Sequence, residues 1–210
     1  MPPVIGVLAL QGAFREHARI LRSLGAIVRE VRLPSHLEGL DGLAMPGGES
    51  TSIGRLMTAY GLLKPLREFA LERPVMATCA GLIVLAERLN GGQRQPSLEV
   101  LDVVVERNGY GRQVDSFEAP VELISPVAQG ADPFTGVFIR APRIVSVGPR
   151  ARVIATVHDA EPVGVLEGHI LALTFHPELT SDSRLHQFFL SLVKTGGSAR
   201  DLPELTLMEV

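Results

Sequence analysis

The chain has 210 residues, of which 46% are hydrophobic and 20% are charged, a composition typical of a globular protein. Its formal net charge of -3 and the lack of any long basic run argue against nucleic acid or an anionic membrane as a partner. No apolar run approaches the roughly 20 residues of a membrane span, and neither an internal disulfide nor a signal peptide is indicated, so we expect a cytoplasmic protein.

The first ninety residues alternate apolar runs with amphipathic stretches, joined by turns that contain glycine or proline. Alternation of strands and helices predicts a parallel sheet with helices on both faces. By hydrophobic periodicity, the strands are expected at 4–10, 27–33, 41–45 and 75–78, and the helices at 14–24, 50–60, 62–71 and 80–89.

The second half of the sequence has a different pattern, in which short runs rich in β-branched residues recur without long helical patterns. We expect these strands to form an antiparallel or mixed sheet that continues the same domain, before a final helix at 182–193. The expected strands lie at 100–105, 121–124, 137–139, 144–147, 153–157 and 170–174. The sequence therefore predicts an α/β fold: a three-layer, doubly wound, mostly parallel sheet with an antiparallel extension. Residues 1–195 would form one domain and residues 196–210 a tail.

The only cysteine, Cys79, lies where a predicted strand ends and a predicted helix begins, with Ala77, Ala80 and Gly81 beside it. Small residues around a reactive side chain are typical of the nucleophile elbow, a tight strand-to-helix turn. In such a turn the helix N-terminus favours a thiolate, and the N–H of Ala80 is free to bind an oxyanion. A buried structural cysteine is the alternative, because free cysteines are among the most buried residues. The position at an elbow favours a nucleophile.

A candidate base lies in the sequence His176-Pro177-Glu178, directly after the predicted strand at 170–174. Ligands of doubly wound sheets bind at the carboxyl ends of the strands, so His176 and Cys79 can meet at one edge. His176 could take a proton from the thiol, and Glu178 could hold the imidazole in the required tautomer. A metal site is the competing use of these residue types, but no second thiol or nearby histidine is available.

The remaining histidines serve as a comparison. His17 and His186 fall in helical patterns, His36 and His158 in turns, and His169 just before a strand. We expect each of them to be a surface or capping residue rather than a catalytic one.

A glycine-rich segment, Pro46-Gly47-Gly48-Glu49-Ser50, follows a third predicted strand. Glycines allow backbone N–H groups to approach a ligand closely, and Ser50 could cap the next helix. A simple glycine turn with a helix cap is the alternative reading. Phosphate binding is a poor explanation, because no Gly-Lys-Ser/Thr follows.

Taken together, these motifs resemble the class I (triad) glutamine amidotransferases, and more closely the glutaminase subunits of pyridoxal 5'-phosphate synthases. Cys-x-Gly and His-Pro-Glu are shared across the wider class, whereas the other motifs are narrower and point to the subfamily. The resemblance runs from about residue 4 to residue 189. Its carriers are Gly6-Val7-Leu8-Ala9-Leu10-Gln11-Gly12, Pro46-Gly47-Gly48-Glu49-Ser50-Thr51, Thr78-Cys79-Ala80-Gly81, Arg107-Asn108-Gly109-Tyr110-Gly111-Arg112-Gln113, Phe138-Ile139-Arg140-Ala141-Pro142 and Phe175-His176-Pro177-Glu178-Leu179.

The resemblance implies a function and a role for each matching residue. It implies hydrolysis of L-glutamine through a glutamyl thioester, with ammonia passed to a (β/α)8-barrel synthase. No cofactor is implied, since pyridoxal phosphate is the product of the partner. By this resemblance, the catalytic triad consists of Cys79, His176 and Glu178, and the oxyanion hole is formed by Gly48 and Ala80. Glutamine is bound by Gly48, Glu49, Ser50, Arg107, Ile139 and Arg140. Gln11 contacts the synthase.

Three alternatives remain at the level of sequence. The chain could serve another amidotransferase, for example in histidine or purine synthesis, which would leave the Arg107 to Gln113 and Phe138 to Pro142 segments unexplained. It could be a stress-response or peptidase-like protein with an elbow cysteine, for which Glu178 would not be required. It could also be a non-enzymatic module that only holds a partner, which the intact triad argues against.

Overall fold

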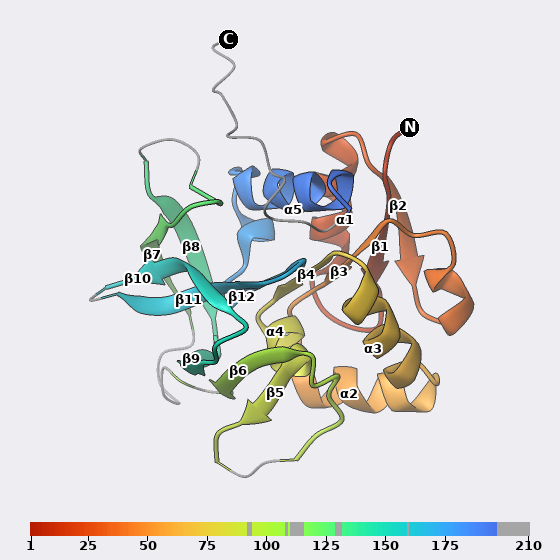
Figure 1. Cartoon of the computed structure of the whole chain (residues 1–210), viewed down its shortest axis with the longest axis horizontal. Coiled ribbons are helices and arrows are strands. Elements are labelled where there is room, and N and C mark those ends of the chain that lie inside the picture. The colour runs from red at the N-terminus through yellow and green to blue at the C-terminus, as the bar shows by residue number, and fades with distance from the viewer. Residues whose placement is uncertain (92–93, 108, 110–115, 129–131, 159, 197–210) are drawn as a thin grey trace.

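The computed structural model describes residues 1–91, 94–107, 109, 116–128, 132–158 and 160–196 (Figure 1). In this part of the chain the elements are β1 (Val4–Leu8), α1 (Phe14–Ser23), β2 (Ile27–Val31), η1 (Pro34–Leu37), β3 (Gly42–Met45), α2 (Ser50–Ala59), α3 (Leu63–Glu72), β4 (Val75–Thr78), α4 (Ala80–Leu85), β5 (Ala86–Leu89), β6 (Leu101–Glu106), β7 (Ser116–Leu123), β8 (Phe134–Ile139), β9 (Arg143–Val147), β10 (Arg152–Val157), β11 (Glu161–Glu167), β12 (Ile170–Leu173), η2 (Pro177–Leu179) and α5 (Arg184–Lys194). None of the described helices is both long and apolar enough to cross a membrane.

The larger sheet of the described residues has the strand order β2-β1-β3-β4-β12-β11-β10-β7-β8. The five strands from β2 to β12 pair in parallel, and those from β12 to β8 pair antiparallel. The predicted mostly parallel sheet with an antiparallel extension is therefore confirmed. Register places Leu173 beside Thr78, so β12 and β4 end at the same level.

Helices cover both faces of the parallel half, which gives three layers (Figure 1). Strand β1 shows how this arises, because its side chains alternate between faces. Ile5 and Val7 lie in a core cluster with residues of α1 and α5, whereas Leu8 lies in the cluster formed with α2, α3 and α4. Burial on both faces explains why these strands read as continuous apolar runs.

Three expectations differ from the structure. The helix predicted at 80–89 ends at Leu85, because Ala86 turns to ψ 139° and Ala86–Leu89 pairs in parallel with β6. Strand β11 was not predicted, since Pro162 and Gly164 within it are residues typical of turns. The strands predicted at 100–105 and 144–147 do form, but in a separate small sheet of order β5-β6-β9.

Candidate active site

Cys79 lies at a sharp turn between β4 and α4, as the small residues around it predict. Its backbone has φ 49° and ψ −106°, a conformation that residues with a Cβ rarely adopt, so the turn holds strain. Two residues later, a side chain at Gly81 would come within 2.3 Å of the carbonyl oxygen of Met45. The small residue lets α4 start directly against β3, which directs Cys79 to the carboxyl edge of the sheet.

His176 follows β12 and meets Cys79 because β12 and β4 are parallel neighbours. The backbone N–H of His176 donates to the carbonyl oxygen of Val137 at 2.8 Å, which fixes the segment against β8. Its ring Nδ1 lies 2.7 Å from Oε1 of Glu178, and its side chain lies beside that of Cys79 in the lining of the same cavity. His176 and Glu178 are both buried. The cysteine, imidazole and carboxylate thus form a continuous chain.

The contacts of His176 and Glu178 determine their pKa values. Burial alone would lower the pKa of His176, but hydrogen bonds and charge interactions with Cys79 and Glu178 raise it to about 10. Burial would raise the pKa of Glu178, but the charge and contact of His17, together with the hydrogen bond from His176, hold it well below its usual range. At neutral pH His176 is therefore an imidazolium held by a carboxylate.

The Gly47-Gly48 segment passes beside both reacting groups. A Cβ on Gly47 would lie 2.3 Å from Cε1 of His176 and 3.2 Å from Cβ of Cys79, so only glycine fits. The N–H of Gly47 donates to Oγ1 of Thr78 at 3.1 Å, and its carbonyl oxygen accepts from the N–H of Ala13 at 3.2 Å. The N–H and C=O of one peptide point in opposite directions. The N–H of Gly48 therefore points away from the Ala13 side.

Glu49 connects three parts of the site. Its N–H donates to Oε1 of the exposed Gln11 at 2.7 Å, and its carboxylate caps α2 by accepting from the N–H groups of Thr51 and Ser52. The hydrogen bond from the Ser52 hydroxyl, joined by those backbone bonds, lowers the pKa of Glu49 to about 2 against a smaller effect of burial. Oε1 of Glu49 also lies 3.1 Å from the Arg107 guanidinium. Glu49 thus holds Arg107 beside the cavity.

These residues line a cavity of about 370 Å³. One wall is the end of β8, whose Ile139 carbonyl oxygen lies 3.9 Å from Sγ of Cys79. Arg140 follows with φ 43°, a second strained position at the site. The lining residues are Gln11, Gly48, Glu49, Ser50, Cys79, Ile83, Arg107, Ile139, Arg140 and His176. The structure therefore brings together the site residues expected from sequence, with Glu178 behind His176 and Ala80 following Cys79 in the chain.

Sequence reasoning missed some residues of the site. Ile83 lies in α4, one turn after Cys79, and its spacing could have indicated it. The expectation that His17 and His186 are surface or capping residues is wrong, because both are fully buried. Nothing local marks them, since they come from helices far apart in the chain. Within the Arg107 to Gln113 motif, Asn108 and 110–113 lie outside the described residues, as does the predicted tail apart from Gly196.

The chain is similar to known proteins over most of its length. A model of the SNO glutamine amidotransferase family matches residues 7–195. The pyridoxal 5'-phosphate synthase subunit PdxT of Deinococcus radiodurans is 55% identical over 193 residues, which cover 90% of this chain and 96% of that protein. The subunit of the same name from Geobacillus kaustophilus is 50% identical over 199 residues, covering 94% of this chain and 98% of that one.

Solved structures show the same fold. A crystal structure of a glutamine amidotransferase has a TM-score of 0.83 and 48% identity, covering 90% of this chain and 98% of that one. The structure of PurLQS from Thermotoga maritima has a TM-score of 0.68 at 16% identity, with coverage of 90% and 98%. The second likeness is one of fold alone.

Proposed function

The chain belongs to the SNO glutamine amidotransferase family, and from that premise we propose that Cys79, His176 and Glu178 are the catalytic triad of a glutaminase. It is an enzyme that acts on glutamine as the glutaminase subunit of a pyridoxal 5'-phosphate synthase. One observation carries the proposed triad: Cys79 and His176 line a cavity, and a buried carboxylate 2.7 Å behind His176 holds its imidazolium.

The first half-reaction is acyl transfer to the cysteine. The Cys79 thiolate attacks the side-chain carboxamide carbon of glutamine, and the carbonyl electrons move to oxygen. Backbone N–H groups of Gly48 and Ala80 bind this oxyanion, the usual task of donors beside an elbow. His176 then gives its proton to the departing nitrogen. The C–N bond breaks, ammonia leaves, and a glutamyl thioester remains on Cys79.

The second half-reaction releases glutamate. His176, now neutral, takes a proton from a water molecule that attacks the thioester carbonyl. The same N–H groups bind the second oxyanion, and its collapse breaks the C–S bond. Glutamate leaves, and the Cys79 thiolate and His176 imidazolium are restored. Glu178 stabilises the imidazolium in both halves and keeps Nδ1 protonated.

Glutamine recognition is the proposed role of the cavity lining. Arg107 and Arg140 supply positive charge that suits the α-carboxylate of the substrate. The Ser50 hydroxyl and the main chain of Gly48, Glu49 and Ile139 offer shorter polar contacts. The cavity volume of about 370 Å³ is at the small end of the usual range for ligand sites, which fits an amino acid.

The proposed partner is a (β/α)8-barrel synthase that receives the ammonia through an internal passage. Ammonia released to water at pH 7 becomes mostly ammonium, a poor nucleophile, so direct transfer protects its reactivity. Gln11 supports a docking role because it is exposed, yet its side chain accepts from the N–H of Glu49 within the cavity wall. Contact of a partner with Gln11 would therefore act on the proposed oxyanion segment.

The direct test measures glutamate release with the cognate barrel synthase present and absent. Wild-type chain should be far more active with the synthase, and Cys79→Ala should be inactive in both conditions. A matched control is His169→Asn, which removes a half-buried histidine at the opposite end of β12. Glutamate release by Cys79→Ala with the synthase present would refute the nucleophile, and equal wild-type rates in both conditions would refute the coupling.

A further inference from the structure

Behind the proposed triad lies a second layer of buried polar side chains. His17 in α1 is fully buried, and its Nε2 lies 3.3 Å from Oε2 of Glu178 and 3.1 Å from Oγ1 of Thr78. Its other ring nitrogen, Nδ1, lies 3.0 Å from Nε2 of His186 in α5, which is also fully buried. Both carboxylate oxygens of Glu178 thus face an imidazole, because Oε1 faces His176.

Burial makes this second layer necessary for the charge of Glu178. A carboxylate with 1% exposure loses its hydration, and a single partner compensates only part of that loss. On the side away from the cavity, His17 supplies an ion-pair contact at 3.3 Å from Oε2, an oxygen that has no hydrogen bond within the described part of the chain. In the described part of the chain no group of three or more histidine, cysteine, aspartate or glutamate side chains is arranged to hold a metal ion.

We infer that His17 is a positioning residue for the proposed glutaminase reaction: its Nε2 holds the second oxygen of Glu178, and His186 fixes the His17 ring. This inference rests on the proposed function, because it gives His17 a role in the reaction through Glu178 and His176. Neither His17 nor His186 lines the cavity. His17 thus acts on the imidazolium without touching the substrate.

The proton positions follow from the surroundings of His186. Burial, together with the charge of His17, lowers the pKa of His186 to about 3, against an opposing effect of Glu178. His186 is therefore neutral at pH 7. Nδ1 of His186 is buried without a hydrogen-bond partner among the described residues, so its unprotonated form is preferred. Nε2 of His17 faces both Oγ1 of Thr78 and Oε2 of Glu178, so a proton on this nitrogen serves both acceptors.

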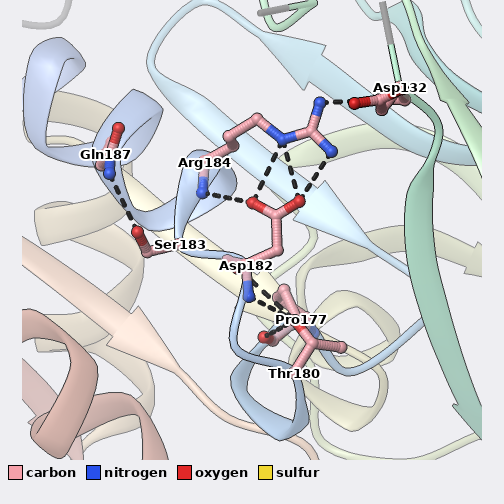
Figure 2. Close-up of polar contacts among 7 residues, drawn as sticks. All are labelled: Asp132, Pro177, Thr180, Asp182, Ser183, Arg184 and Gln187. Atoms are coloured by element: carbon pink, nitrogen blue, oxygen red, sulfur yellow. Dashed lines mark hydrogen bonds and ion pairs between the residues drawn. The ribbon is translucent and has the colours of Figure 1, made fainter. Parts of the chain in front are cut away.

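Polar contacts hold the turn that joins η2 to α5, between Glu178 and His186 in the sequence (Figure 2). The hydroxyl of Thr180 donates to the carbonyl oxygen of Pro177 at 3.2 Å and accepts from the N–H of Asp182 at 3.3 Å. The Arg184 guanidinium binds the carboxylate of Asp182 and donates to the carbonyl oxygen of Asp132 at 3.0 Å. These contacts hold the start of α5, and hence His186, in place relative to the triad.

The side chains that shift the pKa values of Glu178, His176 and His186 come from several elements packed around them. Among the described residues, His17 from α1 and His176 after β12 lower the pKa of Glu178, and Cys79 raises the pKa of His176. His17 lowers the pKa of His186, and Glu178 raises it. Loss of His17 should therefore make Glu178 harder to ionise. A less charged Glu178 stabilises the His176 imidazolium less, so His176 should lose its proton at lower pH.

The experiment compares His17→Gln and His17→Asn with wild type, using the full chain with its synthase. A glutamine amide can place a donor where Nε2 lies, whereas an asparagine amide reaches only the Nδ1 side. His17→Asn should lower kcat about 10- to 100-fold with little change in KM for glutamine, as expected for a residue behind the reacting groups. His17→Gln should recover most of that loss. The alkaline limb of the kcat profile should move to lower pH in His17→Asn only.

A second readout does not depend on glutaminase activity. In the 15N-histidine-labelled chain, the titration midpoint of His176 should fall by about one unit or more in His17→Asn. His186→Leu should lower the midpoint less, and the His169→Asn control should leave it unchanged. Unchanged His176 titration in His17→Asn, or equal kinetics of the Gln and Asn variants, would overturn the inference. If wild type lacks glutaminase activity but the midpoints differ as stated, the proposed function fails and the positioning role stands.

Discussion

The strained turn at Cys79 gives a prediction about stability that can be worked out from the backbone. Replacing Cys79 by alanine removes the sulfur but keeps the Cβ, whereas replacing it by glycine removes both. At φ 49° and ψ −106° the Cβ is the source of the strain, so only Cys79→Gly relieves it. Strain of this kind costs about 1–3 kcal/mol.

Two opposing effects reduce the gain. Glycine adds conformational freedom to the unfolded chain, about 0.5–1 kcal/mol, and loses one buried methyl group, about 0.8 kcal/mol. Cys79→Gly should therefore range from about 0.8 kcal/mol less stable to about 1.7 kcal/mol more stable than Cys79→Ala. In a chain of this size 1 kcal/mol corresponds to about 2–4 °C in Tm.

A matched pair isolates the strain from the opposing effects. In the Cys79→Ala background, Ala80→Gly makes the same chemical change one residue later, in a helix and at similar burial. That change should destabilise the chain by about 1 kcal/mol or more. The urea unfolding free energies of the two alanine-to-glycine changes should differ by about 1–3 kcal/mol. Equal costs at positions 79 and 80 would refute the claim that the elbow is strained.

Three further predictions concern pH and the cavity walls. Because the pKa of His176 is raised from 6.5 to about 10, its stabilisation of the fold is complete below about pH 6.5 and is lost as the pH rises through 10. The urea unfolding free energy should fall by up to about 5 kcal/mol over that range, and a pH-independent value in wild type would contradict this. Gly47→Ala should abolish glutamate release and destabilise the chain by about 1–3 kcal/mol, because its Cβ would meet His176. Gly61→Ala should keep activity, because its Cβ would meet no atom within 4 Å, although its φ of +66° should cost about 1–2 kcal/mol of stability. Glu49→Gln keeps one of the two acceptor oxygens of the α2 cap but loses the charge that holds Arg107, so KM for glutamine should rise about tenfold while kcat changes less. A kcat loss without a change in KM would show instead that Glu49 acts on the reacting groups.

Sequence patterns predicted the parts of the molecule in which local and global preferences agree. The buried parallel strands read as apolar runs, and Cys79, Gly47 and His176 each follow such a run, so their meeting at one edge was predictable. The end of α4 was not predictable, because Ala86–Leu89 continues a helical pattern and becomes a strand only through pairing with β6. Tertiary pairing there overrides local propensity.

The second layer of the site shows a different limit. His17 and His186 look like ordinary helical residues, and nothing at positions 17 or 186 indicates a polar partner. Their burial depends on α1 and α5 lying on the same face of the sheet, 169 positions apart in sequence. Periodicity predicts which face of each helix is apolar, but not which polar side chains meet between two helices. Such pairs become visible only when the packing of helices is known.

The cavity lies where the large sheet changes from parallel to antiparallel pairing. Cys79 and His176 follow parallel strands, whereas Ile139 ends the antiparallel strand β8. Arg140 comes directly after β8, and Arg107 comes directly after β6 of the small sheet. Mutations that accumulate in the antiparallel strands alter the shape and charge offered to a ligand while the reacting groups keep their places. In such a fold, the substrate specificity of an enzyme can change by mutation while its chemical reaction stays the same.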